Sequence, residues 1–267
     1  MRRLLVEGIG DETVVLAGEQ HHRAVRVLRL GRGDRLQVFD GRGNEYEAVV
    51  EFADREQATL SIERRVQPTP EPAIRVSLFQ SIPRGDAMER VVQKCVEIGV
   101  AKIVPLVTRR TVVRPRRGGE GKLARWRKIA LHAVEQSGRA WLVPVAEPVP
   151  PDAIIDRLSS ADLALVPHTT GVCHPEPFGS AQDKRSEGSC LPSDVAAEPI
   201  RSVLDALTRP QSVAVVIGPE GGFSPDEVER FAAAGARPVS LGPRTLRSET
   251  AGLVAASIVL YHYGEMG

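Results

Sequence analysis

The sequence predicts an α/β fold for most of the chain, preceded by a smaller β-rich domain. Within 1–67, apolar and polar side chains alternate at period two in several short runs, the pattern of half-buried strands. From residue 73 onward, short continuous apolar runs alternate with amphipathic stretches, as in parallel sheets that are covered by helices on both faces. The proline-rich segment 68–72 separates the two patterns, so we expect domains over 1–70 and 73–267.

In the N-terminal domain, alternating runs cover 36–38 and 46–52, with the turn-forming residues 40–44 between them. A third run spans 58–62, and a short helix is expected near His21–Leu28. These elements predict a small antiparallel sheet.

The second domain contains six candidate strands, most of them short and apolar: Ile74–Ser81, Ile103–Val107, Leu142–Val145, Leu163–Pro167, Val213–Gly218 and Pro238–Leu241. Helices are expected between them. The clearest helix carries five apolar residues on one stripe, namely Met88, Val91, Val92, Cys95 and Ile98. Gly99 follows as a typical C-terminal glycine, and Cys95 is predicted to be a core residue.

Composition excludes several classes of protein. No apolar run approaches the ~20 residues of a membrane span. Acidic residues interrupt the basic and apolar start before a signal sequence can form. The three cysteines are widely spaced and form no disulfide framework. We therefore expect a soluble cytoplasmic protein. The net charge of +1 argues at first against a polybasic nucleic-acid binder, although it says nothing about where the charges lie.

Segment 171–198 differs from the rest, because ten of its 28 residues are Gly, Ser or Pro and it shows no periodicity. We expect a flexible insertion there. Cys173, His174 and Cys190, with the nearby His168, match no standard zinc spacing, so no metal site is predicted.

A glycine-rich turn, Gly218–Gly222, joins a buried strand to a helix whose start is well specified. Ser224 is the expected N-cap, Pro225 occupies the first helical position, and Glu227 completes a capping box. Open α/β sheets bind ligands at such turns, although a plain tight turn also explains glycines. The turn is neither a dinucleotide fingerprint nor a P-loop, since G-x-G-x-x-G and Gly-Lys-Ser/Thr are both absent.

A second strand–turn–helix unit follows, with Gly242 and Pro243 at its turn. The core face of its helix is expected to comprise Ala251, Val254, Ala255, Ile258 and Tyr261. Four polar residues cluster at the turn and helix start: Arg244, Arg247, Glu249 and Thr250. Two such neighbouring units predict a shared ligand site.

Taken together, Ile217–Ser224 and Leu241–Ala251 closely resemble the RsmE family, bacterial 16S rRNA (uracil-N3)-methyltransferases of the SPOUT superfamily. The resemblance covers nearly the whole chain and includes shorter motifs over 21–29, 80–86, 97–100 and 135–139. Only the insertion 171–198 interrupts the family's pattern.

The resemblance implies an N-terminal PUA-like RNA-binding barrel and a SPOUT-type α/β domain with a C-terminal trefoil knot. It also implies a homodimer that acts on 16S rRNA of the small ribosomal subunit and binds S-adenosylmethionine in the knot. By position, the cofactor would touch three segments, through Thr169, Ile217, Gly218, Pro219, Glu220, Gly221, Gly222, Leu241, Gly242, Leu246, Ser248, Thr250 and Ala251.

Methylation of uracil N3 requires loss of a proton and stabilisation of the resulting anion. Our hypothesis gives Arg247 the second role and Glu249 the role of base. The alternative has Glu249 complementing the helix dipole and Arg247 holding an RNA phosphate.

Two arginine-dense fields, over 23–35 and 109–128, predict phosphate contacts, although a charge run is often only a solvated face. The expected RNA-binding residues are His21, His22, Arg23, Arg26, Arg29, Arg84, Arg109, Arg110, Arg116 and Arg117. The alternative is that one of the two histidines packs under the short helix. Trp126 and Trp141 are expected in the core or in an interface rather than as base-stacking platforms.

Two alternatives stay open: a non-catalytic RNA-binding factor for ribosome assembly, and a SPOUT methyltransferase that acts on another RNA site.

Overall fold

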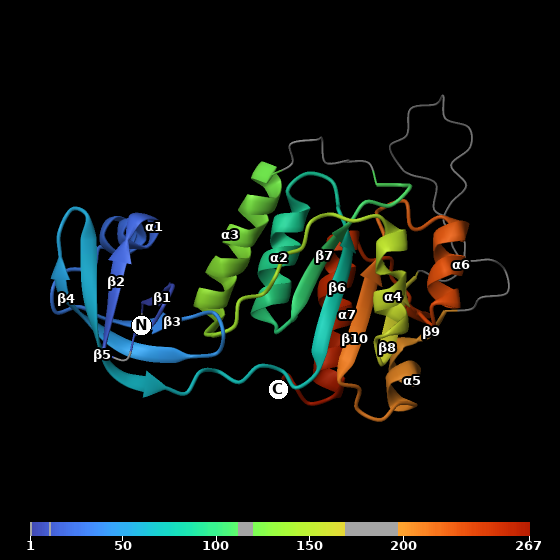
Figure 1. Ribbon diagram of the computed structural model, residues 1–267. Coiled ribbons are helices and arrows are strands. Elements are labelled where there is room, and N and C mark those ends of the chain that lie inside the picture. Colours follow the sequence, from blue (N-terminus) through green and yellow to red (C-terminus); the bar gives the residue numbers. More distant parts are fainter. Residues whose placement is uncertain (1, 11, 112–119, 169–196) are drawn as a thin grey trace. The chain divides into compact units, whose positions relative to one another are not determined.

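The computed structural model describes residues 2–10, 12–111, 120–168 and 197–267 (Figure 1). The chain forms two compact units. Unit 1 comprises Met1–Glu71 together with Leu131–Leu142, and unit 2 comprises Pro72–Ala130 and Val143–Gly267. Unit 1 thus includes a short segment from the middle of the chain. Among the described residues, no helix is long and apolar enough to cross a membrane.

Unit 1 contains a five-stranded sheet in the order β1-β3-β4-β5-β2. Its strands are β1 (Arg3–Leu5), β2 (Thr13–Ala17), β3 (Arg35–Phe39), β4 (Glu45–Ala53) and β5 (Gln57–Val66). The predicted strands correspond to β3, β4 and β5, whereas β1 and β2 were not predicted. The expectation of a purely antiparallel sheet is wrong, because β1 pairs with β3 in parallel. Three residues make β1 too short to show an alternating pattern.

The predicted short helix is present as α1 (Gly18–His21) followed by one π-helical stretch, η1 (His22–Val27). It covers a core of small and branched side chains from the sheet, which includes Leu16, Leu36 and Leu60. Unit 1 therefore has a hydrophobic core of its own.

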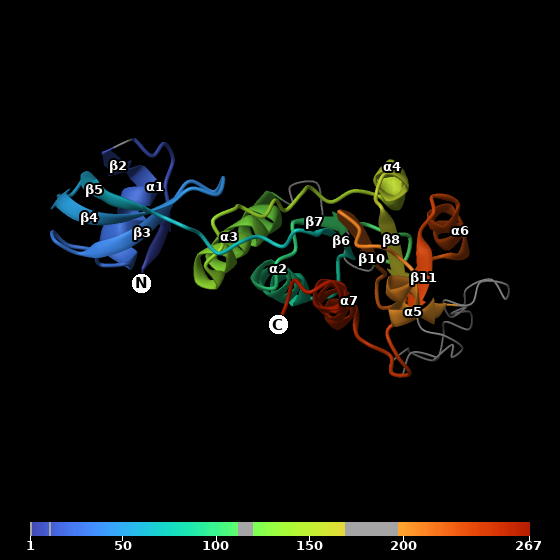
Figure 2. The same ribbon diagram turned by 90° about the horizontal axis from the view of Figure 1, so that it is seen from below.

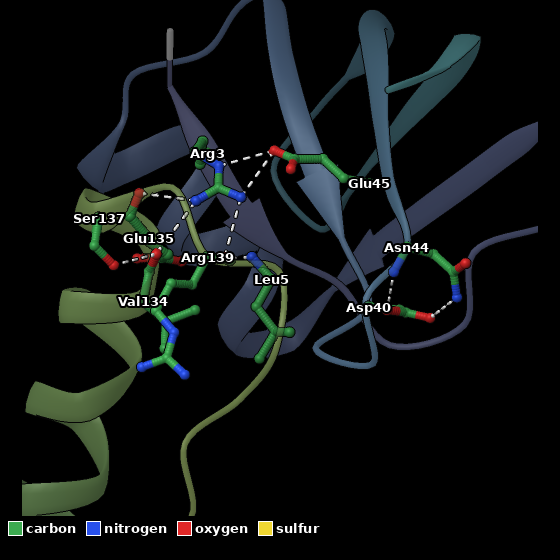
Figure 3. Close-up of polar contacts among 9 residues, drawn as sticks. All are labelled: Arg3, Leu5, Asp40, Asn44, Glu45, Val134, Glu135, Ser137 and Arg139. Carbon is green, nitrogen blue, oxygen red and sulfur yellow. Dashed lines mark hydrogen bonds and ion pairs between the residues drawn. The ribbon is translucent and has the colours of Figure 1, made fainter. Parts of the chain in front are cut away.

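A buried polar network holds the segment Leu131–Leu142 within unit 1 (Figure 3). The guanidinium of Arg3 pairs with Glu45 at 2.8 Å and donates to the backbone carbonyls of Val134, Glu135 and Arg139 at 3.1–3.2 Å. The first two carbonyls belong to the last turn of a helix, where backbone acceptors lack intrahelical partners. Burial raises the pKa of Glu135, and its ion pair with Arg23 only partly offsets this.

Unit 2 is built on a six-stranded parallel sheet in the order β7-β6-β10-β8-β11-β9. Its strands are β6 (Arg75–Ser81), β7 (Lys102–Leu106), β8 (Leu163–Pro167), β9 (Glu198–Pro199), β10 (Ser212–Ile217) and β11 (Arg237–Ser240). The helices are α2 (Ala87–Glu97), α3 (Glu120–Ser137, whose last residues belong to unit 1), η2 (Pro151–Ile154), α4 (Ile155–Ser159), α5 (Ile200–Asp205), α6 (Pro225–Ala233) and α7 (Ser248–His262). Five of the six predicted strands are confirmed.

Helices cover both faces of this sheet, as the apolar strands predicted (Figure 2). Phe79, Ala214 and Val216 face a core that includes side chains of α4 and α6. On the other face, α7 packs against β6, β10 and α2. The predicted stripe of α2 is buried at Met88, Val91, Val92 and Cys95, with Ile98 partly exposed at its end. Burial raises the pKa of the Cys95 thiol to about 12, so the residue acts as a core hydrophobe.

The expected strand Leu142–Val145 is wrong. Leu142 donates to the carbonyl of Gly41 in unit 1, whereas Val145 bridges Ile103 in unit 2. The chain therefore passes from one unit to the other within this apolar run. Pro144, which has no amide hydrogen, further prevents a regular ladder.

The expected core face of α7 is also wrong, because the helix is rotated relative to it. Its buried residues are Ser248, Gly252, Ala255, Ala256, Val259 and Leu260, and Tyr261 is 72% exposed. Almost every residue from Ala251 to Tyr261 is apolar or small, so periodicity alone does not define one stripe. The rotation of α7 about its axis is instead determined by Gly252, which lies against Gln80 and Leu78 of β6.

Candidate functional site

The two predicted turns lie at the same edge of the parallel sheet. Strand β10 pairs with β6 on one side and with β8 on the other, and β11 pairs with β8. Because all these strands are parallel, the segments that follow them meet at one edge. These segments are Ile82–Asp86 after β6, Gly218–Gly222 after β10 and Leu241–Arg247 after β11.

The turn after β10 has the predicted form. The amide of Gly222, at φ +67°, donates to the carbonyl of Pro219 at 2.8 Å. Ser224 caps α6: its hydroxyl accepts from the amide of Glu227, and the Glu227 carboxylate accepts from the amide of Ser224. The capping box and the proline at the first helical position are confirmed.

Arginines from the second predicted RNA-binding field hold this turn from the side of β7. Arg110 donates through Nη1 to the carbonyl of Gly221 at 2.9 Å. The amide of Arg109 donates to the Glu227 carboxylate at 2.9 Å, so Glu227 serves both the cap and the segment after β7. Sequence reasoning placed both arginines on RNA and missed these contacts, which join residues more than 100 positions apart.

A buried hydrogen-bond relay connects β6, α7 and the turn after β10. The Gln80 amide nitrogen donates to the hydroxyl of Ser248 at 2.9 Å, and this hydroxyl donates to the carbonyl of Gly218 at 2.6 Å. Gln80 is fully buried. Within the described part of the chain, Gln80 Oε1 and Ser81 Oγ have no hydrogen-bond partner. Ser248 thus positions the turn and is itself positioned by Gln80.

Gly252 makes room for the Gln80 side chain, since a Cβ at this position would lie 2.6 Å from Gln80 Oε1. We expect Gly252→Ala to lower the free energy of unfolding by about 1–3 kcal/mol in urea denaturation, because the amide is buried and tethered. The same change should cost less in a Gln80→Ala background, where the clashing amide is gone. Gly121→Ala, in α3 with nothing within 4 Å of the added atom, is the matched control and should cause no loss. Equal losses in both backgrounds would contradict this account.

The turn after β11 brings the predicted polar residues to the same edge. Gly242 has φ +117° and its amide donates to the hydroxyl of Ser240 at 3.2 Å. Arg247 is exposed at the N-cap of α7. Glu249 lies in the first helical turn, half-buried, with its carboxylate 3.9 Å from the guanidinium of Arg90. Leu241 and Leu246 are half-buried beside them.

Some predicted site residues are placed elsewhere or lie outside the described residues. Thr169, Arg116, Arg117 and nearly all of the insertion 171–198, including its cysteines, fall outside. His21, the last residue of α1, is buried, and its Nε2 lies 3.1 Å from the Asp54 carbonyl, which favours the alternative of a packed histidine.

Of the remaining predicted RNA-binding residues, Arg23 is ion-paired with Glu135. Five of these predicted RNA-binding residues are exposed: His22, Arg26, Arg29, Arg84 and Arg109. Arg84 also ties the segment after β6 to the turn after β10, because its amide donates to Glu220 at 2.9 Å.

Comparisons with known proteins identify the family to which the chain is similar. Residues 69–260 match the family described as RNA methyltransferase domain, and residues 16–63 match the RNA methyltransferase PUA domain. The chain is 31% identical over 255 residues to ribosomal RNA small subunit methyltransferase E of Synechocystis, covering 95% of this chain and 75% of that protein. Identity to the enzyme of the same name from Bacillus subtilis is 28%, covering 93% and 90%. Among solved structures, that enzyme from Neisseria gonorrhoeae, bound to S-adenosyl methionine, is similar with a TM-score of 0.76, 28% identity and coverage of 98% and 97%.

Proposed function

The chain belongs to the RsmE family of ribosomal RNA small subunit methyltransferases, and on this premise we propose that it methylates N3 of a specific uridine in 16S rRNA, with S-adenosylmethionine as methyl donor. The observation that carries the proposal is the meeting of two glycine turns, Gly218–Gly222 and Leu241–Arg247, at one edge of the sheet.

The residues at this edge suit S-adenosylmethionine. Glycines in the two turns leave backbone amides and carbonyls accessible, because a Cβ at Gly221 or Gly242 would meet only ordinary van der Waals contact or open space. Leu241 and Leu246, both half-buried, supply apolar surface for a purine ring, whereas the Ile217 side chain belongs to the core beneath the first turn. The two segments that carry the proposed cofactor-binding residues follow strands of the same parallel sheet, and the relay from Gln80 through Ser248 holds one turn in place.

The proposed mechanism assigns one task to each of two polar residues at the start of α7. When bound, S-adenosylmethionine supplies a methyl group that its sulfonium already activates. Glu249 accepts the proton from uracil N3, and Arg247 stabilises the negative charge that then develops on the uracil oxygens. Both residues stand at the start of α7, so the rigid helix positions them relative to each other.

Three finer features of the fold and assembly are part of the proposal. A C-terminal trefoil knot is supported by the path of the chain: β8 lies between β10 and β11, and α7 returns to pack on β6 and β10.

A homodimer is supported by the outer side of α7. This side carries the partly exposed Leu253, Val254 and Ile258 and the exposed Tyr261. An N-terminal barrel is supported by two register shifts between β4 and β5, at Glu47/Ala48 and Val50/Phe52, because such irregularities favour a bent sheet. The rRNA substrate places the enzyme in the cytoplasm.

Methyl transfer tests the function directly. The purified protein is incubated with methyl-labelled S-adenosylmethionine and 16S rRNA or small subunits, and the labelled nucleoside is identified. We expect 3-methyluridine. Another methylated nucleoside would indicate a SPOUT enzyme with a different RNA site, and absence of both methyl transfer and cofactor binding would indicate a non-catalytic assembly factor.

The RNA contacts predict a strong salt dependence. Affinity for 16S rRNA should fall by about 10- to 1,000-fold between about 50 and 200 mM salt, because phosphate contacts release counterions. Arg26→Gln should reduce the slope of log affinity against log salt by about one, since Arg26 is exposed. Arg64→Gln is the matched control: Arg64 lies outside both arginine fields and pairs with Glu47 at 2.7 Å, so its loss should leave the slope unchanged. Filter binding over a salt series measures both, and a flat response of the wild type would refute the phosphate contacts.

A further inference from the structure

The two tryptophans of the chain have opposite environments. Trp126 is 5% exposed and belongs to the core, as the sequence predicted. Trp141 is 50% exposed, although the large apolar surface of an indole is costly to leave in water. The residues around Trp141 in unit 1 hold the ring in this exposed position, which suggests that the exposed half of the ring has a function.

One side of the Trp141 indole rests on a glycine. A Cβ at Gly43 would lie 2.6 Å from Trp141 Nε1 and 2.7 Å from Cε2, so only glycine allows the ring to lie against this backbone. Gly43 also has φ +95°, a conformation that other residues rarely adopt. The indole is therefore supported from one side while half of its surface stays open to solvent.

The backbone pairing places an arginine beside the ring. Arg42 and Trp141 form an antiparallel bridge, flanked by hydrogen bonds from Gly43 to Ala140 at 3.1 Å and from Leu142 to Gly41 at 3.0 Å. In such a non-hydrogen-bonded pair, the two side chains leave the same face and start close together. Arg42 is exposed.

The loop that carries Arg42 and Gly43 is held in shape by its own side chains (Figure 3). The Asp40 carboxylate accepts from the amide of Arg42 at 2.7 Å and from the Asn44 side chain at 2.7 Å. Burial opposes ionisation of Asp40, but these hydrogen bonds outweigh it and lower its pKa. Asn44 Oδ1 in turn accepts from Arg65 at 2.7 Å, which holds a second guanidinium at the same loop.

We propose that Trp141, with Arg42 opposite it and Arg65 bonded to Asn44 of the same loop, is a stacking platform for an unpaired base of the RNA substrate. A supported aromatic ring with neighbouring arginines is the combination that binds single-stranded nucleic acid, because the ring stacks on a base while the cations contact phosphates. The proposal rests on the proposed function, since it takes rRNA as the ligand. It also replaces the expectation that Trp141 serves only as a core or interface residue.

The fluorescence of Trp141 reports stacking directly. In a Trp126→Phe variant, Trp141 is the only tryptophan, and titration with a single-stranded fragment of 16S rRNA should quench its emission saturably. A fragment of equal length with abasic sites should bind through phosphates but leave the emission nearly unchanged. Equal quenching by both fragments would overturn the proposal.

Affinity measurements in the wild-type background give a second, independent readout. Trp141→Ala should weaken binding of the rRNA fragment by about 5- to 100-fold, whereas Trp141→Phe, which keeps an aromatic ring, should retain most of the affinity. Phe52→Ala is the matched control, because Phe52 is 49% exposed in the same unit and lies on β4; its affinity should equal that of the wild type.

The measurements distinguish a failure of the stacking platform from a failure of the proposed function. Unchanged rRNA affinity of Trp141→Ala overturns the platform, and a simultaneous loss of dimer mass in light scattering would assign Trp141 to an interface between copies. Methyl transfer by the wild type is measured in parallel. Its absence would refute the proposed function, whereas quenching and affinity alone decide the platform.

Discussion

Arg247→Ala is expected to lower kcat for methyl transfer to 16S rRNA by about 100- to 1,000-fold, the usual effect of removing one donor that stabilises a developing anion. The affinity for S-adenosylmethionine should stay close to that of the wild type. Arg247 is exposed, and the contacts that begin α7 use its backbone carbonyl, which accepts from the amides of Thr250 and Ala251. The substitution therefore removes the guanidinium without removing the start of the helix. Single-turnover methyl transfer and a cofactor titration measure the two quantities.

Arg244→Ala is the matched control, because Arg244 is also exposed and precedes Arg247 by three residues in the same turn. Its kcat should stay near the wild-type value. If Arg247→Ala instead raises KM for rRNA and leaves kcat unchanged, Arg247 holds a phosphate and the anion-stabilising role is wrong. The same assay applies to Glu249→Gln: full activity across the pH range would show that Glu249 is not the base.

The parts of the site that the sequence predicts well are those that depend on neighbouring residues. Ser224, Pro225 and Glu227 specify a helix start through contacts within four positions, and the structure shows the expected capping box. The apolar runs of β6, β8 and β10 likewise reveal themselves locally, because buried parallel strands have few polar residues. Local signals therefore place both turns at the correct ends of their strands.

The parts that the sequence does not predict depend on long-range contacts. Gln80 and Ser248 are 168 positions apart, and nothing in either segment indicates that they share a hydrogen bond. The rotation of α7 follows from the fit of Gly252 against Gln80, which periodicity cannot reveal in a helix that is apolar nearly all round. Likewise, a run of arginines does not show that Arg110 clamps a turn while Arg26 faces solvent.

Arg3→Met is expected to lower the free energy of unfolding of unit 1 by about 3–5 kcal/mol, the range for breaking a buried ion pair by removing one partner. The Arg3 side chain is 8% exposed and its partner Glu45 is 4% exposed. Its removal would leave the Glu45 charge buried and uncompensated. It would also remove the donor to the carbonyls of Val134 and Glu135 at the end of α3. Chemical denaturation followed by circular dichroism measures the loss.

Arg2→Met is the matched control, because the adjacent Arg2 side chain is 48% exposed and lies 3.6 Å from Asp34, a surface pair worth at most about 1 kcal/mol. The double variant Arg3→Met with Glu45→Leu should recover part of the loss, since it removes the uncompensated charge together with its partner. Similar losses for Arg2→Met and Arg3→Met would contradict the buried pair. No recovery in the double variant would mean that the donors to the α3 carbonyls, rather than the charge pair, stabilise this part of unit 1.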